Sequence, residues 1–147
     1  GFITPESLKE AGASGSLLNH SEHQISFAAI KKTVERCKNL GLKLVICVKS
    51  IKEAEKIAKE KPYAIAFEEP KLIATGKSIG YYKKNQIKKF LEKLAGTDII
   101  PLCGAGISSA NDVKMAFELG CKGVLVASAI ANSNDPEKFL KDASKLL

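Results

Sequence analysis

A carboxylate and a loop of small residues follow a short apolar run near the middle of the chain. Residues 63–67 are apolar, and Glu68 and Glu69 follow them directly. The loop at residues 70–76 contains Pro, Ala, Thr and Gly. Strand side chains alternate between the two faces, so only one carboxylate should face the sheet centre. In a dry pocket it is suited to abstract a proton. Glu68 is therefore a candidate base under a movable lid, and simple solvation of both carboxylates is the alternative.

A second junction of this kind supplies a histidine. Asn19, His20, Ser21 and Glu22 end or follow a strand-like run at residues 15–19. A lone histidine after a strand is more often structural than catalytic. Here a helix is predicted to follow, and the positive end of its dipole favours an uncharged imidazole. A neutral imidazole can donate a hydrogen bond to a carbonyl oxygen, which makes His20 a candidate electrophile.

Two loops of small residues follow the last two predicted strands. Residues 103–107 read Cys-Gly-Ala-Gly-Ile, and residues 126–129 read Val-Ala-Ser-Ala. Small side chains let backbone N–H groups approach a ligand, and a helix N-terminus behind them favours an anion. Each motif is weak alone, but together on adjacent late strands they predict a phosphate site.

The elements that must position these residues alternate along the whole chain. Helix signals include Pro5 after Thr4, a Ser50-x-x-Glu53 capping box, and Ser108 or Ser109 before a stretch that Gly120 ends. The expected strands are residues 15–19, 42–48, 63–67, 99–103 and 123–126. Strands that are apolar on both faces and separated by helices indicate a parallel sheet covered by helices. We therefore expect one α/β domain over residues 1–147, with five strands.

The amino-acid composition argues against a nucleic-acid-binding protein. The net charge of +7 comes almost wholly from lysine, and Arg36 is the only arginine. Few aromatic residues are interleaved with the lysines, so nucleic-acid binding is not expected. The lysines are expected on solvent-facing sides of helices: Lys52, Lys56, Lys59, Lys83, Lys84, Lys88 and Lys89.

Cysteine and histidine usage argues against a metal or cofactor. The four cysteines lack CxxC spacing and are expected to be reduced, buried thiols. Only His20 and His23 are available as imidazole ligands, so no metal and no cofactor are expected. No apolar run approaches the ~20 residues of a membrane span and no signal peptide is recognised, so a cytoplasmic location is expected, without membrane partners.

Four motifs, in order, resemble the triose-phosphate isomerase family, and its short archaeal form in particular. Residues 12–22 read Gly-Ala-Ser-Gly-Ser-Leu-Leu-Asn-His-Ser-Glu and are similar to the segment with the family's electrophilic histidine. Residues 68–76 are similar to its catalytic glutamate and lid. Residues 102–107 and 123–128 are similar to its phosphate loops. The resemblance implies a parallel (βα) barrel of the TIM type, here truncated to about five strands.

The resemblance also implies roles. Glu68 would take the proton from the carbon beside the carbonyl of a triose phosphate, and His20 would stabilise the resulting enediolate. These are the roles of the glutamate and the histidine in this family. Asn19, Ser21 and Glu22 would support the site. The phosphate would be bound around Ala74, Gly76, Gly104, Gly106, Ala127 and Ser128. Lid closure would exclude water.

The chain departs from the family pattern in several ways. Glu69 replaces a hinge proline, Ala74 a lid-tip glycine, and His23 an arginine. A full family member is a (βα)₈ barrel of about 220–250 residues, and the chain corresponds to the part from the helix before the fourth strand onward. The first three strands, with an Asn and a Lys that contact substrate, have no counterpart here.

Five parallel strands cannot close an eight-strand barrel. Open edges invite pairing, so we expect a homo-oligomer, a complementing fragment, or a rearranged smaller sheet. The leading function hypothesis is triose-phosphate isomerase, with activity that is weak or that depends on assembly. The alternative is a catalytically inactive barrel fragment that binds phosphate or self-assembles. A barrel enzyme of histidine or tryptophan synthesis is a third hypothesis, which the Asn-His-Ser-Glu motif argues against.

Overall fold

Four of the apolar runs form one parallel sheet in the computed structural model, which describes residues 2–72, 75 and 78–146. The strands lie in chain order, β1-β2-β3-β4. Their bounds are β1 Gly15–Leu18, β2 Lys43–Val48, β3 Ala64–Phe67 and β4 Ile100–Cys103. The register pairs Leu18 with Ile46, Val48 with Phe67 and Phe67 with Cys103. The carboxyl ends of all four strands therefore lie at one edge of the sheet.

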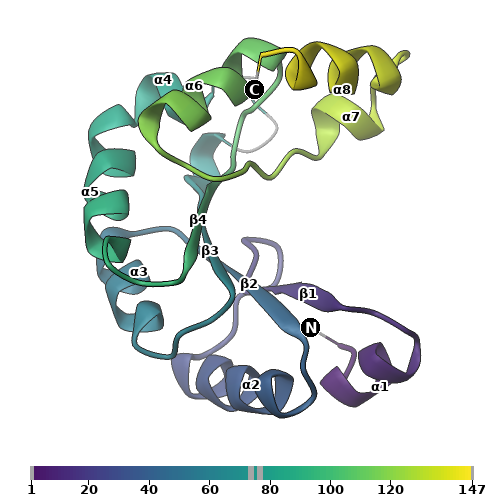
Figure 1. Cartoon of the computed structure of the whole chain (residues 1–147), viewed down its shortest axis with the longest axis vertical. Helices are drawn as coiled ribbons and strands as arrows, with labels where there is room; N and C mark the ends of the chain where they lie inside the picture. The colour runs from purple at the N-terminus through teal and green to yellow at the C-terminus, as the bar shows by residue number, and fades with distance from the viewer. Residues whose placement is uncertain (1, 73–74, 76–77, 147) are drawn as a thin grey trace.

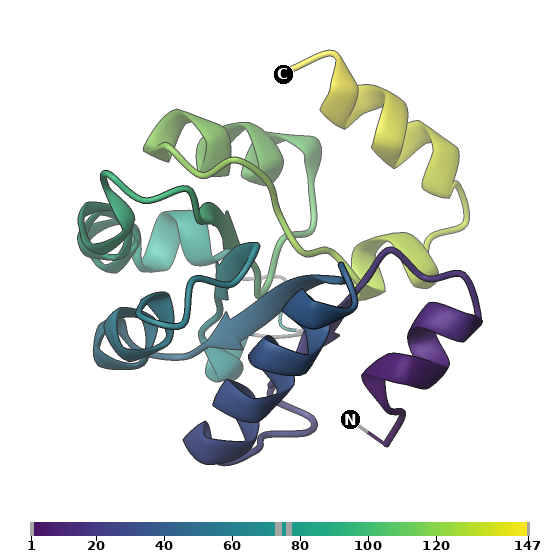
Figure 2. The ribbon, with the colours of Figure 1, turned by 60° about the horizontal axis from the view of Figure 1, so that its bottom comes forward.

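Helices follow each strand and cover the outer side of the sheet (Figure 1). They are α1 Pro5–Glu10, α2 Phe27–Asn39, α3 Ile51–Ala58, α4 Ile79–Tyr82, α5 Lys84–Leu94, α6 Ala110–Leu119, α7 Ser128–Ala131 and α8 Pro136–Ser144, with a 3₁₀ turn at Pro70–Leu72. In Figure 2, α2, α3, α5 and α6 follow one another around the sheet, and α1 and α8 lie at the two ends of the arc. The described strands form an open sheet with two edges, and they do not close into a barrel.

The expected fifth strand at residues 123–126 is wrong. Within the described residues, this segment makes a single parallel bridge, between Cys103 and Val124. The Leu125 N–H donates to the Cys103 carbonyl at 2.9 Å, and the Cys103 N–H donates to the Gly123 carbonyl at 3.3 Å. The segment runs beside β4 but has no strand on its other side, so the ladder stays too short to form a strand.

The capping signals correctly predict the helix ends. Thr4, Ser50 and Ser109 accept hydrogen bonds from backbone N–H groups of the helices that they precede. Gly120 adopts a left-handed φ of 110° and ends α6. The capping box at Ser50 is only half formed, because the Glu53 carboxylate accepts from the Lys49 N–H instead, at 2.9 Å. The short helices α4 and α7 were not expected.

The core lies between β2, β3 and the outer helices, and it fixes the strand that leads to Glu68. All four residues of β3 are buried. The rings of Phe67 and Phe90 stack with centroids 5.5 Å apart. Phe90 and Ile87 of α5 are fully buried against this strand region. Because Phe67 cannot shift without opening the core, the backbone position of the next residue is well determined.

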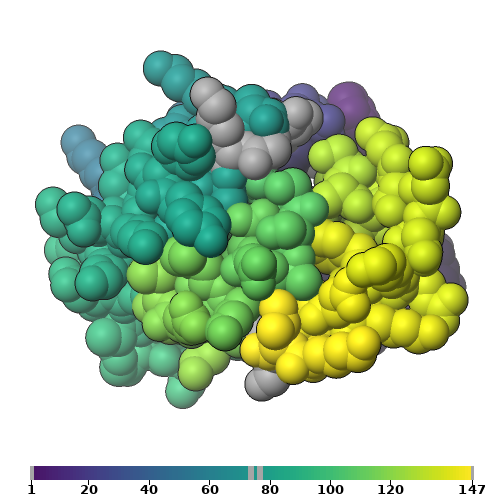
Figure 3. Space-filling view, turned by 90° about the horizontal axis from the view of Figure 1, so that it is seen from above, coloured from purple at the N-terminus to yellow at the C-terminus, as the bar shows by residue number. Residues whose placement is uncertain are grey.

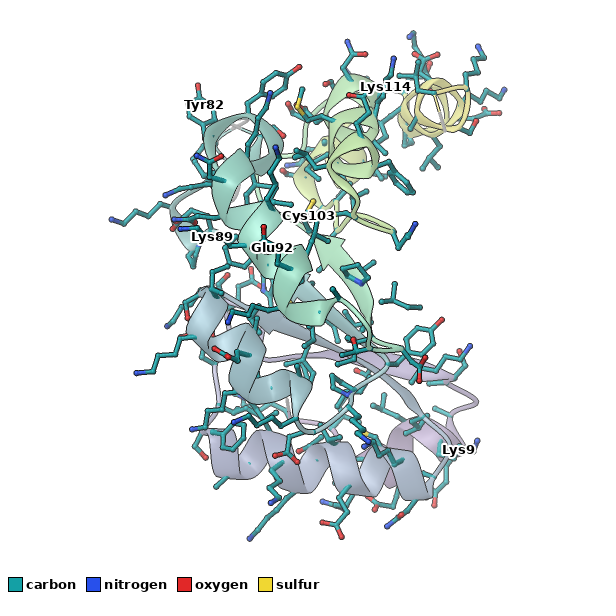
Figure 4. The ribbon with its side chains drawn as sticks, turned by 60° about the vertical axis from the view of Figure 1, so that its left-hand side comes forward. Lys9, Tyr82, Lys89, Glu92, Cys103 and Lys114 are labelled. Carbon is teal, nitrogen blue, oxygen red and sulfur yellow. The ribbon has the colours of Figure 1, made fainter. Side chains whose placement is uncertain are left out.

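The outer helix faces carry the lysines, as expected. Lys89 of α5 and Lys114 of α6 project away from the sheet (Figure 4). Lys83 is an exception, because it is half-buried. Figure 3 shows α8 beside α6, where Ala143 of α8 is buried. Among the helices described, none combines the length and apolar character needed to cross a membrane.

Candidate active site

A cavity of about 530 Å³ lies at the carboxyl ends of the strands. Its volume is within the usual range of roughly 300–1,000 Å³ for sites that bind small molecules. The residues around it come from the ends of β1, β3 and β4 and from the segment after Val124: Leu17, His20, Glu22, Glu68, Ala105, Gly106, Ile107, Ser108, Leu125, Val126, Ala127, Ser128 and Ala129. The parallel register thus brings together segments that are far apart in the sequence.

Glu68 is a buried carboxylate with one unpartnered oxygen. The residue is 5% exposed, and its backbone N–H donates to the Val48 carbonyl at 2.9 Å. Its Oε2 atom is buried without a hydrogen-bond partner among the described residues. Leaving a buried polar atom unpaired costs about 1–3 kcal/mol, and such atoms call for a functional explanation.

His20 faces this free oxygen. Its Nε2 atom lies 3.7 Å from Oε2 of Glu68, which is too far for a hydrogen bond. On the other side of the ring, the Glu22 N–H donates to Nδ1 at 3.5 Å. The Glu22 carboxylate Oε2 also lies 3.4 Å from Nδ1. In the tautomer in which Nδ1 accepts from the Glu22 backbone, the ring hydrogen is on Nε2 and faces the free carboxylate oxygen.

Asn19 holds the turn that carries His20. It is 5% exposed and has a left-handed φ of 62°, which asparagine tolerates better than most residues. Its Nδ2 donates to the Cys47 carbonyl at 2.9 Å and to Glu53 Oε1 at 3.3 Å, and its Oδ1 accepts from the Ile25 N–H at 3.1 Å. Sequence reasoning included Asn19 as a supporting residue but missed Glu53, whose contact depends on tertiary structure.

Glu69 is directed away from the cavity, as strand alternation predicts. Its carboxylate Oε2 lies 3.3 Å from Lys83 Nζ, and its carbonyl accepts from the Leu72 N–H at 2.9 Å. Glu69 is thus tied to Lys83, which comes after the segment that is expected to act as a lid.

The loop after β4 approaches the cavity with two consecutive left-handed residues. Ala105 and Gly106 have φ values of 77° and 70°. A non-glycine residue in this region is unusual and is favoured at functional turns. The Ala105 carbonyl accepts from the Ile79 N–H at 3.2 Å, which connects this loop to the start of α4.

Asp112 closes the N-terminus of α6. Its Oδ2 accepts from the backbone N–H groups of Ser108 and Ser109 at 3.0 and 2.9 Å, and from both hydroxyls. Burial raises the pKa of Asp112, but these hydrogen bonds outweigh burial and hold the pKa below its usual value. The first N–H groups before α6 are therefore already used. By contrast, no side chain caps α7, whose N-cap is Ala127.

The predicted site residues fall into three groups. Those that line the cavity are His20, Glu22, Glu68, Gly106, Ala127 and Ser128. Those beside it are Asn19, Ser21 and Gly104, the last of which packs against the Glu68 carboxylate. Ala74 and Gly76 lie outside the described residues.

Cys47 is a neighbour of Glu68 that sequence reasoning treated only as a buried thiol. Burial is the largest cause that raises the pKa of Cys47, and the adjacent Glu68 carboxylate raises it further. All four cysteines are free and buried, as predicted. Within the described ranges, no group of three or more His, Cys, Asp or Glu side chains is arranged to hold a metal ion.

The fold and the cavity define a parallel α/β protein with a polar site at its strand ends. Comparison with protein families then identifies it more closely. The family model described as triosephosphate isomerase matches residues 1–143. The chain therefore belongs to the triosephosphate isomerase family.

Individual relatives agree with this assignment. The chain is 40% identical over 148 residues to a triosephosphate isomerase of Cenarchaeum symbiosum, covering 100% of this chain and 67% of the relative. It is 41% identical over 143 residues to that of Sulfurisphaera tokodaii, covering 97% and 62%. The chain thus spans about two thirds of the length of these relatives.

Solved structures support the fold alone. A thiamine phosphate pyrophosphorylase from Pyrococcus furiosus superposes with a TM-score of 0.71 at 18% identity, covering 97% of this chain and 63% of that one. At this level of identity, the likeness concerns the arrangement of strands and helices and carries no information about substrate.

Proposed function

We propose that this chain carries the isomerase site of its family and interconverts dihydroxyacetone phosphate and glyceraldehyde 3-phosphate. The observation that supports this most strongly is the position of Glu68 Oε2 beside the cavity. This oxygen has no hydrogen-bond partner among the described residues, and it lies 3.7 Å from His20 Nε2. A buried base and a neutral hydrogen-bond donor on the same side of a cavity suit proton abstraction beside a carbonyl.

In the proposed reaction, Glu68 Oε2 takes a proton from the carbon next to the carbonyl. The electron pair of that C–H bond forms the carbon–carbon double bond of an enediolate. His20 Nε2–H donates a hydrogen bond to the developing oxyanion and lowers the free energy of the transition state. This oxygen takes the proton from His20 Nε2, and Nε2 regains a proton from the hydroxyl on the carbon that Glu68 deprotonated. Glu68 then returns its proton to the neighbouring carbon, so that no net proton is lost or gained.

The phosphate would be held by cavity residues that come late in the chain. Gly106, Ala127 and Ser128 line the cavity, and the start of α7, which has no side-chain cap among the described residues, offers backbone N–H groups. The net charge of +7 favours the approach of an anionic metabolite. By family resemblance, residues around Ala74 and Gly76 would cover the phosphate when substrate is bound.

Catalysis by this chain is proposed to depend on assembly. The chain spans about two thirds of its relatives, and β1 is an edge strand on which Leu17 is 45% exposed. An unpaired edge with apolar side chains favours pairing with another strand. We expect a second copy or a complementing fragment to cover this edge. A monodisperse monomer by light scattering, with no exposed apolar surface by dye binding, would contradict this part.

A phosphate-binding or self-assembling module without turnover is the second candidate. The open sheet favours it, because the described strands do not close around the cavity. Loss of one preorganised contact alone can lower a rate by about 10²–10³.

A coupled isomerase assay and a binding measurement separate the two candidates. If the isomerase proposal is right, the wild type turns over triose phosphate and phosphoglycolate raises its melting temperature. If phosphoglycolate stabilises the fold while no turnover is detected, the binding module is the better account. If neither occurs, both proposals fail.

A further inference from the structure

Behind the His20 turn, a group of side chains joins three separate segments of the chain. Asn19 directly follows β1, Cys47 belongs to β2, and Glu53 lies in the first turn of α3. The Asn19 amide donates to the Cys47 carbonyl and to Glu53 Oε1 with the same nitrogen, at 2.9 and 3.3 Å. The turn before His20 is thus fastened to the neighbouring strand and to the next helix.

The carboxylate of Glu53 contacts both the Asn19 side chain and the backbone at the end of β2. While Oε1 accepts from Asn19, Oε2 accepts from the backbone N–H of Lys49 at 2.9 Å. In an ordinary capping box, this carboxylate would instead return to the N–H of Ser50. Here Ser50 still caps α3 through its own hydroxyl, so the carboxylate of Glu53 is not needed to begin the helix.

The same segment supports Glu68. The Glu68 N–H donates to the carbonyl of Val48, which stands between Cys47 and Lys49 in the chain. The two candidate catalytic residues are therefore fixed to one short stretch at the end of β2: His20 through Asn19, and Glu68 through its backbone. The far end of the His20 loop is tied to this stretch as well, because Lys49 Nζ donates to Gln24 Oε1 at 2.8 Å.

We infer that Glu53 is a positioning residue for His20. By orienting the Asn19 amide and the Lys49 backbone together, it sets the direction in which the imidazole Nε2 faces Glu68. This inference rests on the proposed function only in taking His20 as the electrophile. A displacement of about 1 Å in a reacting group can lower a rate by about 10²-fold, so a residue that acts through two hydrogen bonds can matter for turnover without touching substrate.

The test compares E53A with E55A. Glu55 lies on the same helix, but its side chain is exposed and pairs with Lys93 at the surface, at 3.3 Å. Imidazole ¹⁵N–¹H correlation spectra report on the two histidines separately. We expect E53A to shift and broaden the ring signals of His20 relative to the wild type. E55A should leave the signals of both histidines unchanged.

Turnover gives a second measurement on the same variants. E53A should lower kcat by about 10-fold with little change in KM, since the phosphate contacts are untouched. Wild-type protein without isomerase activity would count against the proposed function, yet the imidazole spectra would still decide whether Glu53 positions His20.

A second variant covers the case in which E53A does not fold. N19G removes the amide side chain, and glycine readily adopts the left-handed φ at this position. N19G should perturb the His20 signals, and adding E53A to N19G should change them by less than E53A changes those of the wild type, because the contact between Asn19 and Glu53 is already lost. If E53A folds and its His20 signals match those of the wild type, the inference is overturned. If E53A does not fold, the same result in folded N19G overturns it.

Discussion

The carboxylate of Glu68 occupies space that exists only because residue 104 is glycine. A Cβ atom at Gly104 would lie 2.5 Å from Oε1 and 3.1 Å from Cγ of Glu68. Both distances are shorter than ordinary van der Waals contact. The sequence suggested a phosphate contact at Gly104, but its backbone lies against the base, so its small size sets where the carboxylate can be.

This contact predicts that G104A displaces the base. The new methyl group would push the Glu68 carboxylate from its position, and isomerase kcat should fall by about 10-fold or more. G80A is a suitable control, since a Cβ there would meet Met115 Cγ at 3.0 Å, and neither residue lines the cavity. Equal rates for G104A and wild type, with both folded, would contradict the placement of the carboxylate.

The ion pair between Glu69 and Lys83 predicts a role for Lys83 in holding the start of the lid segment. K83M should lower kcat a few-fold, while its free energy of unfolding changes by less than about 1 kcal/mol, as is typical of partly exposed pairs. The exposed Lys88 supplies the control K88M. The effect should weaken at high salt, which screens the pair in the wild type. If K83M and K88M have the same kcat, the pair has no such role.

Asp112 predicts a pH-dependent stability. Its folded pKa is below the usual value, so the charged form stabilises the fold above the unfolded pKa of about 3.9, and this contribution is lost as the pH falls through the folded pKa. At pH 7, the free energy of unfolding of D112N should be about 1–2 kcal/mol lower than that of the wild type, because the capping interactions are lost. Denaturant titrations at several pH values measure this difference, which should shrink below about pH 4.

The control for this prediction is D98N, because Asp98 is exposed and lies before β4 rather than in a cap. D98N should follow the wild type across the same pH range. A D112N deficit that stays constant down to the most acidic pH at which the protein folds would show that the carboxylate charge is not responsible.

The buried thiols predict low chemical reactivity. Burial raises the pKa of Cys37 and of Cys47, and only the thiolate attacks disulfide reagents. With an aromatic disulfide reagent, native protein should react far more slowly than protein in denaturant, which should release all four equivalents. A thiol that reacts as fast in the native state as in denaturant would contradict the burial of that cysteine.

Much of the fold could be predicted from local sequence signals. Apolar runs bounded by caps and glycines located β2, β3 and β4 within one or two residues, because each is apolar along most of its length. The run at residues 123–126 carries the same signal and yet makes only one bridge. A run of apolar residues predicts that a segment is partly buried, but strand formation also needs neighbouring strands to bond with.

The candidate site was predictable where chemistry follows a strand end. His20 and Glu68 were found from their position after apolar runs. Strand alternation predicted that only one of Glu68 and Glu69 faces the sheet centre, and the family resemblance indicated Glu68. Glu53, Lys83 and Cys47 were not found, because their contacts join segments that are distant in sequence: Asn19 with Glu53, and Glu69 with Lys83. No local pattern distinguishes such residues from ordinary helix surface or core.

Proton transfer by Glu68 is the central claim, and hydrogen exchange tests it most directly. Dihydroxyacetone phosphate incubated with the protein in D₂O should gain deuterium at the carbon beside the carbonyl, which NMR detects even when net isomerisation is slow. We predict that the wild type and E92Q, a control on the exposed face of α5 (Figure 4), exchange at the same rate. E68Q should exchange no faster than the protein-free solution. Exchange by E68Q at the wild-type rate would contradict the assignment of Glu68 as the base.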